Sequence, residues 1–323
     1  MLRNKHYICE AGAYKNAETG LKLKRYFMNR LDFLKRLGLI AGGAVAVGAG
    51  LGGVSCGLSG CSEQTRKRKI IGLQLYSIRD AMAEDVKSAL AKVAEIGYAN
   101  LETASYSDGN LYGMPAAEFR KMAEDAGLKI TGAHLGSGYS QQTEADRLEW
   151  WKKAMDTHAA IDCENVVIPS VGFSDETTLD DVKAVAEYFN KVGDMASQRG
   201  LRLSYHNHAR ELESRDGQVI LDYLIDNTDA SLVSYELDVY WATVGGANPA
   251  EYIEKYSGRF PLLHIKDESI IGESGKIDFE PIFKAAYRNG MEEFYVEVEK
   301  NTLPPEICVE RSFDFLDVAD YVK

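Results

Sequence analysis

The sequence predicts an α/β protein in which eight strand–helix units close into a single (β/α)8 barrel. Apolar, strand-like runs alternate with amphipathic helical runs from about residue 70 to the end of the chain, and this alternation repeats eight times. Strands that alternate with helices form parallel sheets, and eight such units in roughly 250 residues fit a closed barrel. A doubly wound open sheet is the main alternative, but no Gly-rich phosphate-binding turn follows the first strand.

The first unit illustrates how each element is assigned. The run 70–76 is apolar and strand-like, and a helical pattern over 83–96 follows it. Leu90 and Val93 lie on the apolar face of this helix, and Gly97 ends it. By the same criteria, further strands are expected at about 98–102, 129–134, 165–169, 201–208, 231–238, 260–266 and 293–299, and further helices at about 115–127, 144–159, 179–198, 219–226, 249–256, 279–288 and 306–321.

The net charge of −12 is distributed unevenly along the chain. Residues 1–69 carry 13 basic and 4 acidic residues, so residues 70–323 carry 24 basic and 45 acidic ones, a balance of −21. A body this acidic repels a phosphate backbone, which argues against nucleic acid as a partner. The basic first part of the chain requires a separate explanation.

Residues 1–69 are interpreted as a leader, and residues 70–323 as the barrel. From Met28, the expected start, a basic stretch precedes an uncharged run at 37–60, and small residues precede Cys61, which is the layout of an export signal. The segment ending at Cys61 resembles a bacterial lipobox. This resemblance implies lipidation of Cys61 and an exported lipoprotein, held to the membrane by lipid on the periplasmic or cell-surface side. The alternatives are a disordered tail and a permanent anchor helix.

Two of the five cysteines, Cys163 and Cys308, fall within the predicted barrel. The cysteines form no CxxC pair and show no metal-type spacing. In an oxidising compartment these two residues are candidates for a disulfide, and the alternative is two buried free thiols.

Four of the six histidines fall at predicted strand ends, together with several carboxylates. In a parallel barrel, reactive residues gather at the C-terminal ends of the strands. Charged and imidazole groups at that position are costly to desolvate unless a partner binds them, and a divalent cation (Mn²⁺, Mg²⁺, Co²⁺ or Zn²⁺) binds such groups together. The ends of the last four strands therefore predict a metal site made by His206, Asp238, His264 and Glu297.

Several of these strand-end residues also have a purely structural interpretation. His134 either contacts substrate or makes a structural hydrogen bond. Trp241 either packs in the core or forms an aromatic wall against which a sugar stacks. Lys266 is either an ion-pair partner of Asp267 or Glu297 or a participant in the chemistry. Candidate ligands at the ends of four successive strands indicate a metal site more specifically than any one of these residues does alone.

The barrel resembles the xylose isomerase-like barrel superfamily, which includes sugar (phosphate) isomerases and epimerases, inosose dehydratase and the family 2 apurinic endonucleases. The resemblance covers essentially all of residues 70–323. The segments that carry it are Gly72-Leu73-Gln74-Leu75-Tyr76-Ser77-Ile78-Arg79, Leu101-Glu102, Gly132-Ala133-His134-Leu135, Tyr205-His206-Asn207-His208, Asp238-Val239-Tyr240-Trp241, His264-Ile265-Lys266-Asp267 and Val296-Glu297.

This resemblance implies a metal held by Glu, Asp, His and Glu from the fifth to the eighth strand. Asp238, His264 and Glu297 match the last three of these ligands. His206 stands where the family's first Glu usually stands, so either His206 ligates the metal or Glu211 reaches in from just beyond the strand.

The missing glutamate affects the expected mechanism. Epimerases of the family use two metal-bound Glu residues on opposite faces of the substrate as acid and base. Glu297 is expected to serve one face, and His206, Glu211 or Lys266 the other, since proton abstraction needs a base of suitable pKa. The remaining candidate substrate contacts are Tyr76, Glu102, His134, His208, Glu211 and Trp241.

The leading functional hypothesis is a divalent-metal-dependent isomerase or epimerase of a sugar or keto-sugar that works by proton transfer through a metal-stabilised enediolate. Export argues for an unphosphorylated carbohydrate substrate. One alternative is a lyase, dehydratase or hydrolase that acts on keto-glycosides or inositol-like compounds. Another is a non-catalytic sugar-binding lipoprotein. Assembly as a homo-oligomer stays open.

Overall fold

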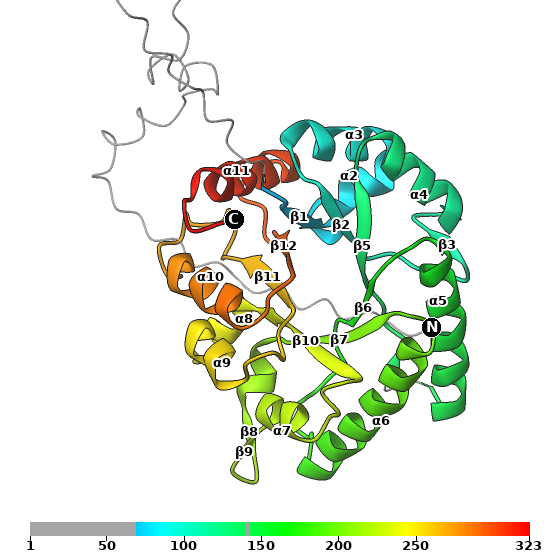
Figure 1. Ribbon diagram of the computed structural model, residues 1–323, viewed down its shortest axis with the longest axis vertical. Helices are drawn as coiled ribbons and strands as arrows, with labels where there is room; N and C mark the ends of the chain where they lie inside the picture. Colours follow the sequence, from blue (N-terminus) through cyan, green and yellow to red (C-terminus); the bar gives the residue numbers. More distant parts are fainter. Residues whose placement is uncertain (1–68, 140–141) are drawn as a thin grey trace, which may run out of the picture. The chain divides into compact units, whose positions relative to one another are not determined.

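A closed barrel of eight parallel strands forms the centre of the computed structural model, which describes residues 69–139 and 142–323 (Figure 1). Each strand pairs with its neighbours in chain order, and the last strand pairs with the first. The barrel strands are β1 (Gly72–Gln74), β2 (Asn100–Thr103), β5 (Lys129–His134), β6 (Asn165–Ile168), β7 (Arg202–His206), β10 (Val233–Asp238), β11 (Leu262–Lys266) and β12 (Glu293–Glu297). This topology confirms the predicted (β/α)8 barrel, the architecture known as the TIM barrel.

Helices cover the outer side of the barrel (Figure 1). They are α2 (Arg79–Glu84), α3 (Val86–Ile96), α4 (Ala116–Asp125), α5 (Glu144–Ala160), α6 (Leu179–Ser197), α7 (Ile220–Asp226), α8 (Val239–Val244), α9 (Pro249–Lys255), α10 (Phe279–Arg288) and α11 (Pro305–Val318), with 3-10 turns η1 (Leu75–Ile78) and η3 (Ala209–Leu212). Two short hairpins, β3–β4 (Asn110–Leu111 and Met114–Pro115) and β8–β9 (Ser214–Arg215 and Gln218–Val219), extend loops beyond the barrel. The sequence pattern predicts neither hairpin, because their strands are only two residues long.

The first strand–helix unit is more interrupted than its apolar pattern predicts. The strand ends at Gln74, whose side-chain oxygen accepts a hydrogen bond from the Tyr76 amide at 2.9 Å and so caps η1. Asp85 is extended and caps α3 through the Ser88 amide at 3.1 Å, which divides the predicted helix at 83–96 into two. Local side-chain caps therefore override the longer helical period.

Helix α8 is absent from the sequence prediction and begins directly after the strand β10. Asp238, the last residue of that strand, is its N-cap, and its Oδ1 accepts a hydrogen bond from the Trp241 amide at 2.8 Å. The cap fixes the start of α8 at the mouth of the barrel, so Trp241 is held close to the strand end.

Apolar and aromatic side chains fill the barrel interior one layer below the strand ends. Val167, Leu262 and Tyr295 form this layer and are fully buried. A Cβ atom at Gly72 would lie 2.5 Å from Tyr295 Cδ1, and one at Gly132 would lie 2.7 Å from Tyr295 Oη. Both glycines are therefore needed to admit the Tyr295 ring, which closes the interior beneath the strand ends.

The two cysteines of the barrel, Cys163 and Cys308, are free thiols, and both are buried. The Cys163 thiol donates a hydrogen bond to the Asn165 carbonyl at 3.3 Å, and burial raises its pKa to about 12. The structure thus supports two buried free thiols and not a disulfide.

The predicted leader lies almost entirely outside the described residues, as do Met28 and Cys61. Lys69 is the first described residue, and its ammonium group donates hydrogen bonds to the carbonyls of Leu316, at 2.9 Å, and Ala319. Within residues 69–139 and 142–323, no helix has the length and apolar character that crossing a membrane requires.

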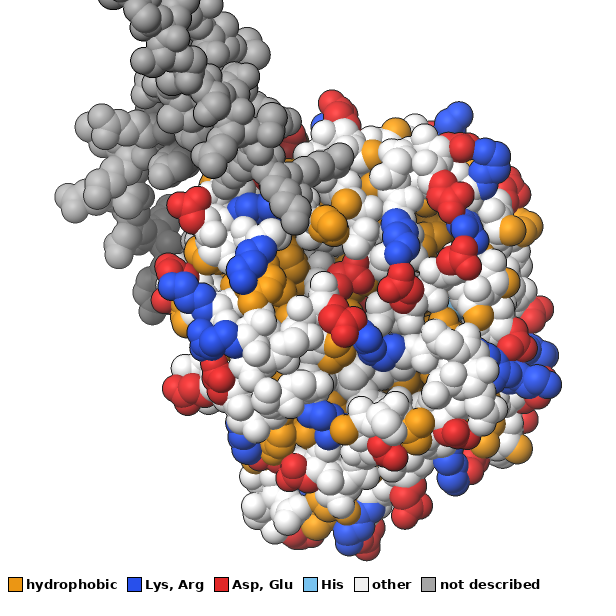
Figure 2. Space-filling view, viewed as in Figure 1, with side chains coloured by type: hydrophobic (Ala, Val, Ile, Leu, Met, Phe, Trp, Pro, Cys, Tyr) orange, Lys and Arg blue, Asp and Glu red, His pale blue; other side chains and the backbone are white. Residues whose placement is uncertain are grey.

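Acidic and basic side chains are interspersed over the barrel surface that Figure 2 shows. Examples of close surface pairs are Lys129 with Glu164, at 2.5 Å, and Arg202 with Glu292, at 2.8 Å. Exposed pairs of this kind contribute roughly 0–1 kcal/mol each. The stability of the fold therefore depends mainly on the buried contacts between strands and helices.

The close approach of α6 to the loop before β10 gives a test of this packing. A Cβ at Gly193 would lie 2.6 Å from the Leu232 carbonyl oxygen. Gly to Ala within a helix normally stabilises by about 1 kcal/mol. Here we expect Gly193→Ala to lower the free energy of unfolding by about 1–3 kcal/mol, because the added methyl group would force the backbone at Leu232 to move. Urea unfolding measures this, and Ser197→Ala at the exposed end of α6 is the control, with a change below about 0.5 kcal/mol. A stabilised Gly193→Ala variant would contradict the packing described.

Candidate metal centre

The register between neighbouring strands brings the predicted ligands together. Asp238 on β10 pairs with His264 on β11, and Lys266 on β11 pairs with Glu297 on β12. Residues two positions apart on a strand point to the same side, so His264 and Lys266 both point into the barrel. All four side chains are buried.

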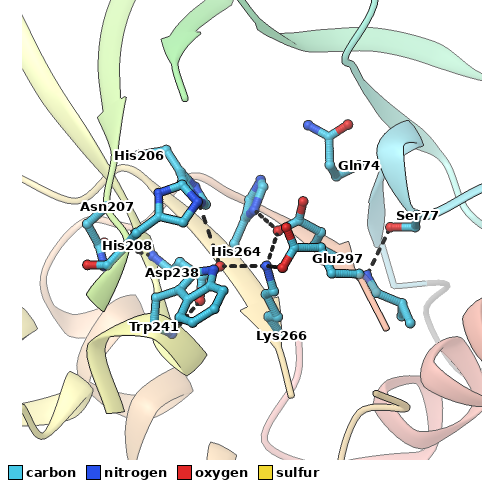
Figure 3. A network of polar contacts seen from close by, with 12 residues as sticks. Gln74, Ser77, His206, Asn207, His208, Asp238, Trp241, His264, Lys266 and Glu297 are labelled. Atoms are coloured by element: carbon cyan, nitrogen blue, oxygen red, sulfur yellow. Dashed lines mark hydrogen bonds and ion pairs between the residues drawn. The ribbon is translucent and has the colours of Figure 1, made fainter. Parts of the chain in front are cut away.

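Four residues at the mouth of the barrel form a group that we call the outer cluster: His206, Asp238, His264 and Glu297 (Figure 3). One ligand-type atom of each lies within 4.8 Å of those of the others. His206 Nε2 is 3.8 Å from Asp238 Oδ2, and His264 Nδ1 is 3.2 Å from Glu297 Oε2. The structure therefore brings together the four residues that the strand ends predict as ligands.

A buried lysine adds a positive charge to the outer cluster. Lys266 Nζ lies 2.9 Å from Glu297 Oε2, 3.6 Å from Asp238 Oδ2 and 2.8 Å from Glu299 Oε2 (Figure 3). Burial alone lowers the pKa of Lys266, but these carboxylates outweigh it and raise that pKa above its ordinary value. Lys266 is therefore held as an ammonium ion, paired with Glu297 as one of the sequence interpretations has it.

A second group, which we call the inner cluster, consists of His134, His206, Glu236 and His264. Glu236 Oε2 lies 2.9 Å from His134 Nε2, 3.2 Å from His206 Nδ1 and 3.1 Å from His264 Nε2. Glu102 adjoins the group, with Oε2 2.7 Å from His264 Nε2 and 3.2 Å from His134 Nε2. His206 and His264 belong to both clusters, and each turns one ring nitrogen toward each cluster.

Burial dominates the electrostatics of the inner cluster. It raises the pKa of both Glu102 and Glu236 to about 7. It lowers the pKa of His134, and it lowers the pKa of His206 well below its ordinary value. Burial also acts to lower the pKa of His264, but Glu236 and Glu102 outweigh it, and that pKa is raised well above its ordinary value. In the absence of another cation, a proton on His264 thus compensates the buried carboxylates.

The two carboxylates of the outer cluster differ in acidity. Burial raises the pKa of Asp238 to about 6, even though Lys266 is close. Burial also acts to raise the pKa of Glu297, but the positive charges of His264 and Lys266 outweigh it, and that pKa is lowered below its ordinary value. Both groups are therefore mainly ionised at neutral pH, and Glu297 is the more strongly ionised.

The outer cluster fits a divalent cation. Asp238 Oδ2 is buried and has no hydrogen-bond partner among the described residues, although Oδ1 accepts from the Trp241 amide. An unsatisfied buried carboxylate oxygen is costly, and a cation next to it removes that cost. Two carboxylates and two imidazoles are donors that Mn²⁺, Co²⁺ and Zn²⁺ accept.

Two aromatic side chains form one wall beside the outer cluster. The rings of His208 and Trp241 lie 5.6 Å apart, and the Lys266 ammonium lies 5.0 Å from the Trp241 ring (Figure 3). The indole Nε1 of Trp241 is buried and has no hydrogen-bond partner among the described residues. An aromatic face with an unused N–H donor suits a ligand that presents both C–H and hydroxyl groups.

Two of the predicted substrate contacts lie apart from both clusters. Glu211 accepts hydrogen bonds from the Tyr205 hydroxyl at 2.5 Å and from the His208 amide at 2.9 Å, so both of its oxygens are used in the turn after β7. This geometry does not place Glu211 in the position of the missing glutamate. Tyr76 is 43% exposed, and the Arg79 guanidinium lies 4.5 Å from its ring centre.

Sequence reasoning did not assign a role to two of the residues at the site. Glu236 touches all three histidines of the inner cluster, yet only Asp238 of its strand is predicted as a ligand. The signal was present, because Glu236 precedes Asp238 by two positions and must point to the same side of the strand. The other residue is Gln74, whose side-chain amide donates a hydrogen bond to Glu102 Oε2 at 2.6 Å. The Gln74 side chain is placed there because its oxygen caps η1, a local interaction that the strand pattern does not predict.

Comparison with known proteins places this geometry in a family. Residues 90–317 match the family model described as "Xylose isomerase-like TIM barrel". The crystal structure titled as a sugar phosphate isomerase/epimerase from Parabacteroides distasonis is 34% identical, with a TM-score of 0.74 over 79% of this chain and 100% of that one.

Curated relatives named inosose dehydratase are similar over shorter stretches. The protein from Clostridium perfringens is 30% identical over 143 residues, which are 37% of this chain and 48% of that protein, so the chain spans about half the length of this relative. The one from Clostridium botulinum is 25% identical over 242 residues, 64% of this chain and 79% of that protein. From the family match and the similarity to the Parabacteroides structure, this chain belongs to the xylose isomerase-like TIM barrel family.

Proposed function

We propose that this protein is an enzyme that depends on a divalent metal and isomerises or epimerises an unphosphorylated sugar or keto-sugar. The observation that carries the proposal is the outer cluster, in which two carboxylates and two imidazoles from four successive strands meet at the barrel mouth. The similar structure from Parabacteroides distasonis, titled as a sugar phosphate isomerase/epimerase, supports the reaction class.

In this proposal, His206, Asp238, His264 and Glu297 hold the metal. When bound, the metal polarises a substrate carbonyl or hydroxyl oxygen and offsets the negative charge that develops there. Trp241 and His208 orient the sugar ring, and the indole N–H of Trp241, which has no hydrogen-bond partner among the described residues, donates a hydrogen bond to a substrate oxygen.

Among the protein's own groups, Glu297 is the proposed base. Its carboxylate is ionised, and it removes a proton from the carbon next to the carbonyl on one face of the substrate. A return of the proton to the opposite face needs a second group. Glu211 is occupied in the turn after β7, and Lys266 is held as an ammonium ion, so Lys266 is a poor base, and its raised pKa makes it a proton donor only toward a strongly basic oxygen.

In this proposal the site has one carboxylate base and one ammonium group, with no second base among the described residues. This difference favours a second candidate function, a lyase or dehydratase for keto-glycosides or inositol-like compounds. The specific observation is the pairing of Lys266 with Glu297 at 2.9 Å, which sets an acid beside a base. In an elimination, Glu297 takes the carbon-bound proton, a C=C bond forms, the neighbouring C–O bond breaks, and Lys266 protonates the departing oxygen. The relatives named inosose dehydratase are consistent with this candidate.

We also propose that residues 1–69 export the barrel and that Cys61 carries a lipid. Support comes only from the basic, uncharged and small-residue layout of that segment. Because sugar phosphates are mainly intracellular, an exported barrel favours an unphosphorylated carbohydrate as substrate.

Substitution of Glu297 tests the shared first step of both reactions. We expect Glu297→Gln to lower turnover, and the exchange of a carbon-bound substrate proton in D₂O, by roughly 100-fold or more, because the base is lost. Mass spectrometry of keto-sugars incubated with metal-loaded enzyme measures both. Glu280→Gln, on the exposed side of α10, is the control and should leave both rates unchanged. Turnover by Glu297→Gln within about threefold of the wild type would refute the assigned role.

Substitution of Lys266 separates the two reaction classes. If Lys266 protonates a leaving group, Lys266→Met should slow the cleavage of a 3-keto-glycoside that has an alkyl leaving group by roughly 100-fold. Cleavage of a 3-keto-glycoside that has a nitrophenyl leaving group should slow far less, because a good leaving group needs no acid. Product analysis by NMR at saturating metal shows whether an aglycone or an isomer is formed. An isomer as the sole product would exclude the elimination, and equal losses for both leaving groups would exclude Lys266 as its acid.

A further inference from the structure

The inner cluster and the adjoining Glu102 bring two buried carboxylates together with three imidazoles. Glu102 and Glu236 are both 0% exposed, and no Lys or Arg among the described residues forms an ion pair with either. Their only cationic partners are histidines. Glu102 Oε1 and Glu236 Oε1 are buried and lack hydrogen-bond partners within the described part of the chain. Burial of such carboxylates favours either a proton on them or a cation beside them.

The outer cluster differs in this respect, because it already contains a cation. Lys266 Nζ lies within 3.6 Å of both of its carboxylates, Asp238 and Glu297. A lysine in this position neutralises part of the outer charge and repels a second positive charge there. A divalent ion at the inner cluster meets no such ammonium group in direct contact with its carboxylates.

The ligand atoms of the inner cluster have the spacing of a metal site. The Glu236 oxygen lies 2.9–3.2 Å from one nitrogen of each of the three imidazoles, and all four ligand atoms lie within 4.8 Å of one another. Bonds of about 2.1 Å to a tetrahedral ion place neighbouring ligand atoms about 3.4 Å apart. Only small movements of the side chains are therefore needed to admit an ion.

The two clusters use different nitrogen atoms of the two histidines that they share, so with both ions bound each of these rings gives up its remaining N–H proton to solvent and bridges the ions as an imidazolate. His206 faces Glu236 with Nδ1 and Asp238 with Nε2. His264 faces Glu236 with Nε2 and Glu297 with Nδ1. A histidine that ligates a metal commonly gives its other nitrogen to a carboxylate, which would explain Glu236 as a positioning group alone. That explanation assigns no role to His134. The members of the outer cluster that His134 contacts are His206 and His264, which belong to both clusters.

We propose that the inner cluster is a metal site of its own, in which His134, His206, Glu236 and His264 bind a divalent transition-metal ion. Three imidazoles and one carboxylate make it a site for Zn²⁺ or Co²⁺ in preference to Mg²⁺. This site goes beyond the outer one on which the proposed function rests, and it requires no particular substrate.

The test is the number of metal ions that the full chain binds. Protein stripped by a chelator is titrated with Co²⁺, and bound metal is measured by mass spectrometry of the metal content and by the visible absorption of cobalt. We expect two ions per wild-type chain. His134→Asn and Glu236→Gln should each lose one ion and keep the outer one, whereas Asp238→Asn should keep the inner one. His208→Asn, at the same barrel end but outside both clusters, is the matched control and should bind two.

Crystals of the wild-type protein soaked in Co²⁺ decide the question even where a variant fails to fold. Anomalous density between His134 and Glu236 supports the proposal. One ion per chain, with density at the outer cluster alone, overturns it and leaves the proposed function intact. No bound ion at either cluster overturns both. Two ions in each of the His134→Asn and Glu236→Gln variants would also contradict the inner site.

Discussion

The burial of carboxylates and imidazoles at one end of an otherwise apolar barrel is the constraint on which the site depends. A buried carboxylate that stays ionised without a partner costs several kcal/mol, so it either takes up a proton or is accompanied by a cation. The structure supplies two internal cations, the ammonium of Lys266 and the imidazolium of His264. Neither satisfies Asp238 Oδ2 by a hydrogen bond. The divalent metal that we propose for the outer cluster would supply this missing partner.

The replacement of a family glutamate by His206 changes what the outer cluster can do. A site with one carboxylate fewer and a lysine in contact carries less negative charge than the arrangement that the resemblance implies. It also presents one ionised carboxylate, Glu297, next to one proton donor, Lys266. Such a pair moves a proton off carbon and delivers another to oxygen, which suits elimination as well as isomerisation. The fold by itself therefore does not determine which of the two proposed reactions this site carries out.

The fold could be predicted from the sequence because its eight units repeat a simple period, and the proximity of the four residues of the outer cluster could be predicted because reactive residues of such barrels lie at strand ends. The parts that were missed depend on local hydrogen bonds. Asp85 splits a helix through its side chain, and Asp238 starts α8 in the same way. Within the inner cluster, the alternation along β10 indicates that Glu236 points into the barrel, but its contact with His134 joins strands far apart in the chain, and no spacing in the sequence encodes that contact.

The layer of Val167, Leu262 and Tyr295 beneath the clusters has a consequence for kinetics. Because this layer is fully buried and is packed against Gly72 and Gly132, it blocks passage from the opposite end of the barrel. Ions and protons that exchange with the deeper histidines must then travel through the mouth, past whatever occupies it. A sugar bound at the mouth would therefore slow the exchange of protons at the histidines beneath it.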